Sequence, residues 1–102
     1  MNTPFQWGKQ TASHLGGTRD PMAIAWPNRI TADKTPRAQF THVIDVGPTI
    51  LEAAGIPEPK VVDGIDQEPM DGTSFLFSLD DASASERHTV QYFEMFGARH
   101  VQ

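Results

Sequence analysis

The clearest pattern of apolar and polar positions lies in residues 42–57, HVIDVGPTILEAAGIP. Asp45 is a residue type favoured at a helix N-cap, and Pro48 falls in the first turn, where a missing N–H costs nothing. Gly55 can adopt the left-handed conformation after the last turn, and Pro57 prevents the helix from continuing. The pattern predicts one helix that begins after Asp45 and ends before Gly55. Its apolar side chains share one face: Val46, Ile50, Leu51 and Ala54.

Three shorter apolar runs flank this helix. MAIAW, residues 22–26, is closed by Pro27 and is typical of a buried strand in an α/β sheet. SFLFSL, residues 74–79, is a short apolar segment, and HTVQYFEMFG, residues 88–97, has the β-branched and aromatic content of an antiparallel strand with one face in water. A short helical turn is expected about Gln10–Ser13. The remaining stretches are rich in Gly, Pro or charge and predict loops: 4–21, 27–39, 57–73 and 80–87.

Composition removes several classes of function. The chain has 102 residues, a net charge of -5 and no basic stripe, which argues against a nucleic-acid partner. The absence of cysteine excludes disulfides, thiolate metal sites and a cysteine nucleophile. No apolar run approaches the length of a membrane span, and MNTPFQWGKQ lacks a signal-peptide pattern, so no membrane partner is expected and the compartment stays open. The chain is short for an enzyme with a deep cleft, and its last residues resemble an unfinished strand, so we expect a fragment.

Three blocks of residues follow one another in a recognisable order. Lys9 precedes GGTRDP, residues 16–21, and this arrangement resembles the lysine that precedes a Gly-Gly-x-Arg-x-Pro loop in the sulfatase family. DVGPTILEAAG, residues 45–55, is similar to its Asp-x-x-Pro-Thr-Leu-Leu-x-x-Ala-Gly helix, and DGTSFL, residues 71–76, to its Asp-Gly-x-Ser-Leu-Leu segment. The tail QYFEMFG, residues 91–97, is similar to bacterial arylsulfatases in particular. The three blocks cover nearly the whole chain.

The resemblance implies an alkaline-phosphatase-like α/β fold. Residues 1–79 would be the C-terminal part of its large domain, and residues 80–102 a linker and the start of a small antiparallel subdomain. Family members are sulfuric ester hydrolases that use a formylglycine, made from Cys or Ser in a Cys/Ser-x-Pro-x-Arg motif, and a divalent metal, usually calcium. That motif and the upstream acidic ligands have no counterpart here. The formylglycine and Ca²⁺ are therefore expected outside this chain, which alone is predicted to be inactive, and the partner implied is a small-molecule sulfate ester.

Lys9 and His14 are the site residues that this resemblance implies. By residue type alone, Lys9 is a solvated loop lysine. The corresponding family lysine contacts the sulfate group, where a positioned ammonium stabilises the charge that develops during sulfuryl transfer. His14 could line the substrate mouth or donate a proton to the leaving oxygen, or it could simply pack its ring in the loop. Lys9 is assigned as catalytic and substrate-binding, and His14 as substrate-binding.

The glycines at 16–17 are expected to provide positive φ or a close approach of two backbones. Arg19 has a planar fork that suits sulfate, but we favour a brace in which it pairs with a carboxylate, either Asp20 or one outside this chain. The glycine pair and Arg19 are therefore expected to shape the loop that carries Lys9.

Metal ligation is the alternative role for Asp80 and Asp81. An apolar run that ends in paired aspartates delivers metal ligands in many α/β enzymes. Here a linker composition follows, which favours solvated acids that cap a turn, and the four histidines show no ligand spacing. No metal ligand is assigned within the chain.

Two alternatives to a sulfatase stay open. A phosphodiesterase or phosphonate monoester hydrolase of the same superfamily uses similar metal chemistry on phosphorus. A non-catalytic interaction module could also keep the scaffold without the reaction.

Overall fold

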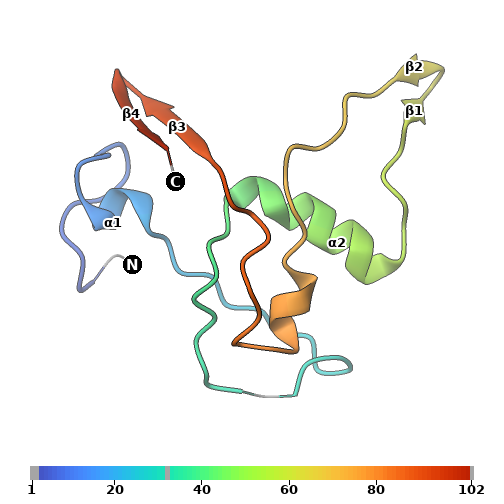
Figure 1. Cartoon of the computed structure of the whole chain (residues 1–102), viewed down its shortest axis with the longest axis horizontal. Coiled ribbons are helices and arrows are strands. Elements are labelled where there is room, and N and C mark those ends of the chain that lie inside the picture. Colours follow the sequence, from blue (N-terminus) through green and yellow to red (C-terminus); the bar gives the residue numbers. More distant parts are fainter. Residues whose placement is uncertain (1–2, 32, 102) are drawn as a thin grey trace. The chain divides into compact units, whose positions relative to one another are not determined.

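The computed structural model describes residues 3–31 and 33–101. The chain divides into two compact units, a central unit (Asn28–Thr89) and a terminal unit formed by the described residues of Met1–Pro27 and Val90–Gln102. Figure 1 shows the elements of both units along the chain. Among the described residues, no helix has the length and apolar character needed to cross a membrane.

The predicted helix is confirmed in the central unit. A 3₁₀ helix, η1 (Val43–Asp45), leads directly into the α-helix α2 (Val46–Ala54), drawn in green in Figure 1. Gly55 follows with a φ of 66°, and the N–H of Ile56 bonds to the carbonyl of Leu51 at 2.9 Å. This left-handed ending satisfies carbonyls of the last turn, which is why the helix stops where Gly55 and Pro57 predict.

Asp45 stands at the predicted N-cap position of α2, but its side chain does not form the expected cap. Its backbone is already helical, with φ -75° and ψ -15°, and its side chain makes no capping hydrogen bond to α2. The fully buried carboxylate instead accepts the N–H groups of His42 and Thr73, each at 2.7 Å. The Nδ1 of His88 lies 2.7 and 2.8 Å from its two oxygens. Asp45 therefore joins three segments of the central unit.

Gly72 makes one of these contacts possible. A Cβ built on Gly72 would lie 2.2 Å from the carbonyl oxygen of Ile44. Only a glycine lets the two backbones come this close, and the approach brings the next N–H, that of Thr73, to the Asp45 carboxylate. The Asp-Gly-Thr order in residues 71–73 thus serves the contact with η1 and α2.

The buried side of α2 is not the face that carries Ile50. Thr49 is buried, whereas Ile50 is 61% exposed. The hydroxyl of Thr49 donates to the carbonyl of Asp45 at 2.7 Å and accepts the N–H of Phe75 at 3.1 Å. The buried residue of α2 is therefore polar, because its neighbours offer backbone groups that must be hydrogen-bonded.

Two short elements complete the central unit. Residues 74–79 contain a 3₁₀ helix, η2 (Leu76–Leu79), which follows the buried side chain of Phe75. The strands β1 (Val61–Val62) and β2 (Ile65–Asp66) pair antiparallel as an exposed hairpin.

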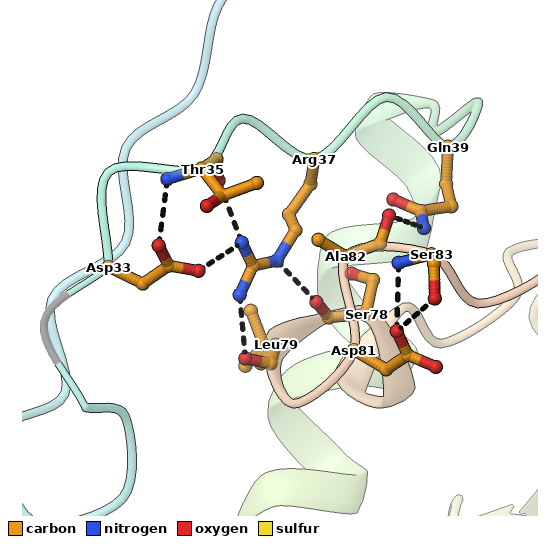
Figure 2. A network of polar contacts seen from close by, with 9 residues as sticks. All are labelled: Asp33, Thr35, Arg37, Gln39, Ser78, Leu79, Asp81, Ala82 and Ser83. Atoms are coloured by element: carbon orange, nitrogen blue, oxygen red, sulfur yellow. Dashed lines mark hydrogen bonds and ion pairs between the residues drawn. The ribbon is translucent and has the colours of Figure 1, made fainter.

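Arg37 ties the end of η2 to residues 33–35, as Figure 2 shows. Its Nε donates to the carbonyl of Ser78 at 2.6 Å, and its Nη2 donates to the carbonyl of Leu79 at 3.1 Å. Its Nη1 reaches the carbonyl of Thr35 at 2.7 Å and the carboxylate of Asp33 at 2.8 Å. One guanidinium thus satisfies carbonyls that the end of a helix leaves without partners.

The aspartates after η2 are engaged by neighbouring side chains. Asp80 forms a bidentate ion pair with Arg29, whose hydrogen bonds hold the pKa of that carboxyl below its usual range. Asp81 accepts the N–H of Ser83 at 2.8 Å and its hydroxyl at 2.7 Å. The predicted turn cap is confirmed for Asp81, whereas Asp80 is held by an arginine 51 residues away in the sequence.

The terminal unit contains the predicted antiparallel strand. β3 (Tyr92–Met95) pairs with β4 (Ala98–Val101) in a hairpin, with Tyr92 opposite Val101 and Met95 opposite Ala98. The strand expected in residues 88–97 is confirmed over the length of β3.

Two other predictions for this unit are wrong. Residues 22–26 form no strand in the described structure, and their side chains are largely exposed because no described strand pairs with them. The helical turn expected about Gln10–Ser13 lies further along, as the one-turn helix α1 (Leu15–Thr18).

The described residues combine helices with two small antiparallel sheets and contain no parallel pair. This content is consistent with an α/β protein. The alkaline-phosphatase-like arrangement and the division into 1–79 and 80–102 stay predictions.

We expect Asp45→Ala to lower the free energy of unfolding by about 3–5 kcal/mol, because it leaves buried donors without an acceptor. Asp45→Asn should also destabilise, since its NH₂ group would face one of the donors. The measurement is urea unfolding of the protein that contains this chain, with hydrogen exchange at the Thr73 N–H. Asp81→Asn is the matched control, because an exposed asparagine can still cap its turn. Equal stability of Asp45→Asn and Asp81→Asn would contradict the central role of Asp45.

The Asp33 carboxyl provides a prediction about pH. The Thr35 N–H, at 2.8 Å, and the Arg37 guanidinium lower the pKa of Asp33 from 3.8 to about 2. Since the pKa is depressed in the folded state, the carboxylate's stabilising contribution is complete above about pH 4 and is lost as the pH falls toward 2. Carbon-13 NMR of the Asp33 carboxyl should give a midpoint near 2. Arg37→Ala should raise this midpoint and Arg87→Ala should leave it unchanged; a midpoint near 4 in the parent protein would refute the contact.

Candidate functional site

Lys9 lies at the tip of a tight turn in the terminal unit. The N–H of Thr11 bonds to the carbonyl of Gly8 at 3.2 Å, which places Lys9 and Gln10 at the two central positions. Gln10 has a φ of 74°, the sign that a type II turn requires at its third residue. The Lys9 side chain is exposed, so its ammonium faces solvent from a backbone of defined geometry.

The glycine pair holds this turn in place. A Cβ on Gly16 would lie 2.2 Å from the carbonyl oxygens of Gln6 and Trp7, and the Gly16 N–H bonds to the Gln6 carbonyl at 3.0 Å. A Cβ on Gly17 would lie 2.2 Å from the carbonyl oxygen of Thr11. The predicted close approach is confirmed, and neither glycine has a positive φ. The pair thus packs directly against residues 6–11, the segment that carries Lys9.

His14 belongs to the same loop. Its Nδ1 lies 2.9 Å from the hydroxyl of Ser13, and its ring centre lies 5.8 Å from that of Trp7, with the planes at 43°. The structure therefore brings the predicted residue His14 beside the segment that carries Lys9. A substrate-binding role for either residue stays a prediction.

Arg19 contacts an aromatic ring. Its guanidinium carbon lies 5.7 Å from the centre of the Phe5 ring, within the range of a cation–π contact. No ion pair joins it to Asp20 in the described part of the chain, so a brace through Asp20 is not formed, and pairing with a carboxylate outside this chain stays a prediction. Arg19 still connects the two ends of the loop, because Phe5 precedes the turn and Arg19 follows the glycines.

The buried Asp45–His88 pair was missed by the sequence analysis. His88 is 8% exposed, and its ring and that of Phe40 form a T-shaped pair with a centre-to-centre distance of 5.3 Å. The two partners are 43 residues apart, so no local spacing indicates the pair. Its burial and its backbone donors indicate a structural role within the central unit.

The described residues do not fit a metal site. No group of three or more His, Asp or Glu side chains in residues 3–31 and 33–101 is placed to hold a metal ion. Asp80 and Asp81 are engaged by Arg29 and Ser83, whereas calcium requires six to eight oxygen ligands.

Comparison with known proteins matches most of the chain, from His14 and the glycine pair onward, to one family. Residues 13–102 match the family described as N-sulphoglucosamine sulphohydrolase, C-terminal. His14 and the glycine pair lie within the matched residues, and Lys9 lies just before them. No solved structure matches the chain.

Two curated relatives are sulfatases. An N-acetylgalactosamine-6-sulfatase from Canis lupus familiaris is 40% identical over 70 residues, which cover 67% of this chain and 13% of the relative. A sulfatase from Formosa agariphila is 36% identical over 84 residues, which cover 80% of this chain and 14% of the relative. The chain thus spans a small part of the length of the relatives that it matches. With a family match over residues 13–102 and these two relatives, the chain belongs to the sulfatase family.

Proposed function

We propose that the protein containing this chain hydrolyses sulfate esters and that Lys9 contacts the sulfate group. The observation that carries the proposal is the match to sulfatases over most of the chain. An exposed ammonium on a turn fixed by two close glycine contacts supports the assignment of Lys9.

Lys9 would act by electrostatic stabilisation. During sulfuryl transfer, negative charge develops on the sulfate oxygens and on the leaving oxygen. A cation held in advance at that position stabilises this charge without having to reorganise during the reaction. The Gly8–Thr11 turn and the glycine pair behind it supply the required positioning.

The nucleophile and the metal would be supplied by other residues of the sulfatase. This sequence has no Cys/Ser-x-Pro-x-Arg motif, and its described residues form no metal group. Val43 and Ile50, near the start and middle of the same helical segment, are 75% and 61% exposed. Apolar side chains left in water to this extent support a chain that packs against further protein, in keeping with relatives that are several times longer.

The names of the relatives support a sulfated amino sugar as substrate. One relative is named for N-acetylgalactosamine 6-sulfate, and the matched family for N-sulphoglucosamine. A more specific form of the proposal is an arylsulfatase that uses calcium and a formylglycine. The resemblance of the sequence motifs to arylsulfatases implies this form. Assays should therefore compare an amino-sugar sulfate, an aryl sulfate and a phosphodiester in parallel, and exclusive activity on the phosphodiester would overturn the proposal.

We expect Lys9→Ala to lower kcat on the preferred sulfate ester by roughly two to three orders of magnitude, the loss typical for one charge-stabilising donor. Lys9→Arg should recover little, because a wide planar fork does not replace a compact ammonium. Steady-state kinetics of the enzyme that contains this chain are the measurement. Lys34→Ala, at another exposed loop lysine, is the control. Near-normal turnover of Lys9→Ala would remove the catalytic role from this loop.

Gly17→Ala should impair the same activity without touching a charged group. Its methyl group would collide with the carbonyl oxygen of Thr11 and displace the turn that carries Lys9. Gly47→Ala, within α2, is the matched control. Its methyl group would meet only the Met70 sulfur, at a van der Waals distance of 3.7 Å. We expect at least a tenfold loss of kcat/KM in Gly17→Ala, in line with the cost of a small misplacement, and almost none in Gly47→Ala. Equal activity of the two variants would show that the glycine contact does not position Lys9.

A further inference from the structure

Trp7 stands on the same loop as Lys9 and is 66% exposed. A tryptophan ring is among the largest apolar surfaces that a residue can bury, and it carries a π face suited to stacking. This ring lies two positions before Lys9 in the sequence, at the start of the turn. An exposed ring of this size beside a candidate anion-binding lysine calls for a functional explanation.

The backbone of Trp7 is held in an unusual conformation. Its φ is 64°, which is uncommon for a bulky residue. The conformation is fixed from outside, because Gly16 packs against the Trp7 carbonyl and donates its N–H to Gln6. Strain of this kind persists only where the surroundings impose it, and it gathers at ligand-binding positions.

Polar groups border the Trp7 ring. The His14 ring lies 5.8 Å away at an angle of 43°, and the Ser13 hydroxyl lies 2.9 Å from His14 Nδ1. An apolar ring, hydrogen-bonding groups beside it and a cation two residues along the chain suit a ligand that combines an apolar ring face, hydroxyl groups and an anion.

We propose that Trp7 is a stacking platform for the pyranose ring of a sulfated sugar whose sulfate is taken by Lys9. The C–H groups of the sugar would lie on the indole face, and its hydroxyl groups would meet His14 and Ser13. The inference deepens the proposed function and rests on it for the role of Lys9. Trp7 would thus determine specificity for a carbohydrate sulfate, whereas Lys9 recognises any sulfate.

The test compares ligands that do and do not contain the ring. N-acetylgalactosamine 6-sulfate and inorganic sulfate are titrated by calorimetry into the full-length protein that contains this chain. In Trp7→Ala the Kd for the sugar sulfate should rise about 3- to 10-fold, the range of one aromatic stacking contact, while the Kd for inorganic sulfate stays the same. Trp7→Phe should restore most of the affinity. Phe96→Ala, which removes a ring that is 85% exposed on the β3–β4 hairpin, should change neither Kd.

Each other outcome has a defined meaning. An unchanged Kd for the sugar sulfate in Trp7→Ala, an equal weakening of both ligands, or no binding of the sugar sulfate to the parent protein would overturn the platform. Turnover separates this inference from the proposed function. Trp7-dependent binding without hydrolysis of any sulfate ester would refute the proposed activity and leave the platform standing. Hydrolysis of the sugar sulfate with a KM that does not change in Trp7→Ala would support the proposed activity and overturn the platform.

Discussion

The arrangement of the central unit depends on the buried carboxylate of Asp45. A charge removed from water must be matched by hydrogen-bond partners, and here the partners come from three separate segments, at His42, Thr73 and His88. If any one of these segments moved away, the carboxylate would lose one of its hydrogen-bond partners. The single side chain thus fixes the start of α2, the approach to η2 and the end of the unit in one arrangement.

Hydrogen bonds take the place that apolar packing has in most domains. Among the described residues, one hydrophobic residue is buried, Phe75. Four buried residues are polar: Asp45, Thr49, Ser78 and His88. Such groups are stable inside a protein only when each finds its partner, so the unit specifies its geometry through directional contacts. The exposed apolar side chains of the same helical segment are then available for contacts with other parts of a sulfatase.

Close glycine contacts recur in both units and serve the same purpose. Gly72 lets its backbone meet Ile44, which presents Thr73 to Asp45. Gly16 and Gly17 let α1 pack on residues 6–11, which presents Trp7 and Lys9 to solvent. In each case the glycine does no chemistry itself. It allows a neighbouring group to be held where a side chain would have kept the two backbones apart.

The sequence by itself determined the features that rest on local signals. α2 ends where Gly55 and Pro57 require, the strand in residues 88–97 has the β-branched and aromatic content of its type, and the spacing of the motifs indicates the sulfatase family. For the candidate site, the glycine pair indicated a close contact, whereas the ring contact between Trp7 and His14 was not predicted.

Only the tertiary structure decided what the buried groups contact. Asp45 is a residue type favoured at an N-cap, but its side chain contacts His88, 43 residues away. The Arg37 side chain donates hydrogen bonds to carbonyls at the end of η2. Thr49 is buried in place of Ile50, and residues 22–26 form no strand. The physical reason is the same in each case. Local sequence sets the backbone preferences of a few neighbouring residues, whereas the partner of a buried polar group or of a strand edge is supplied by a segment far along the chain.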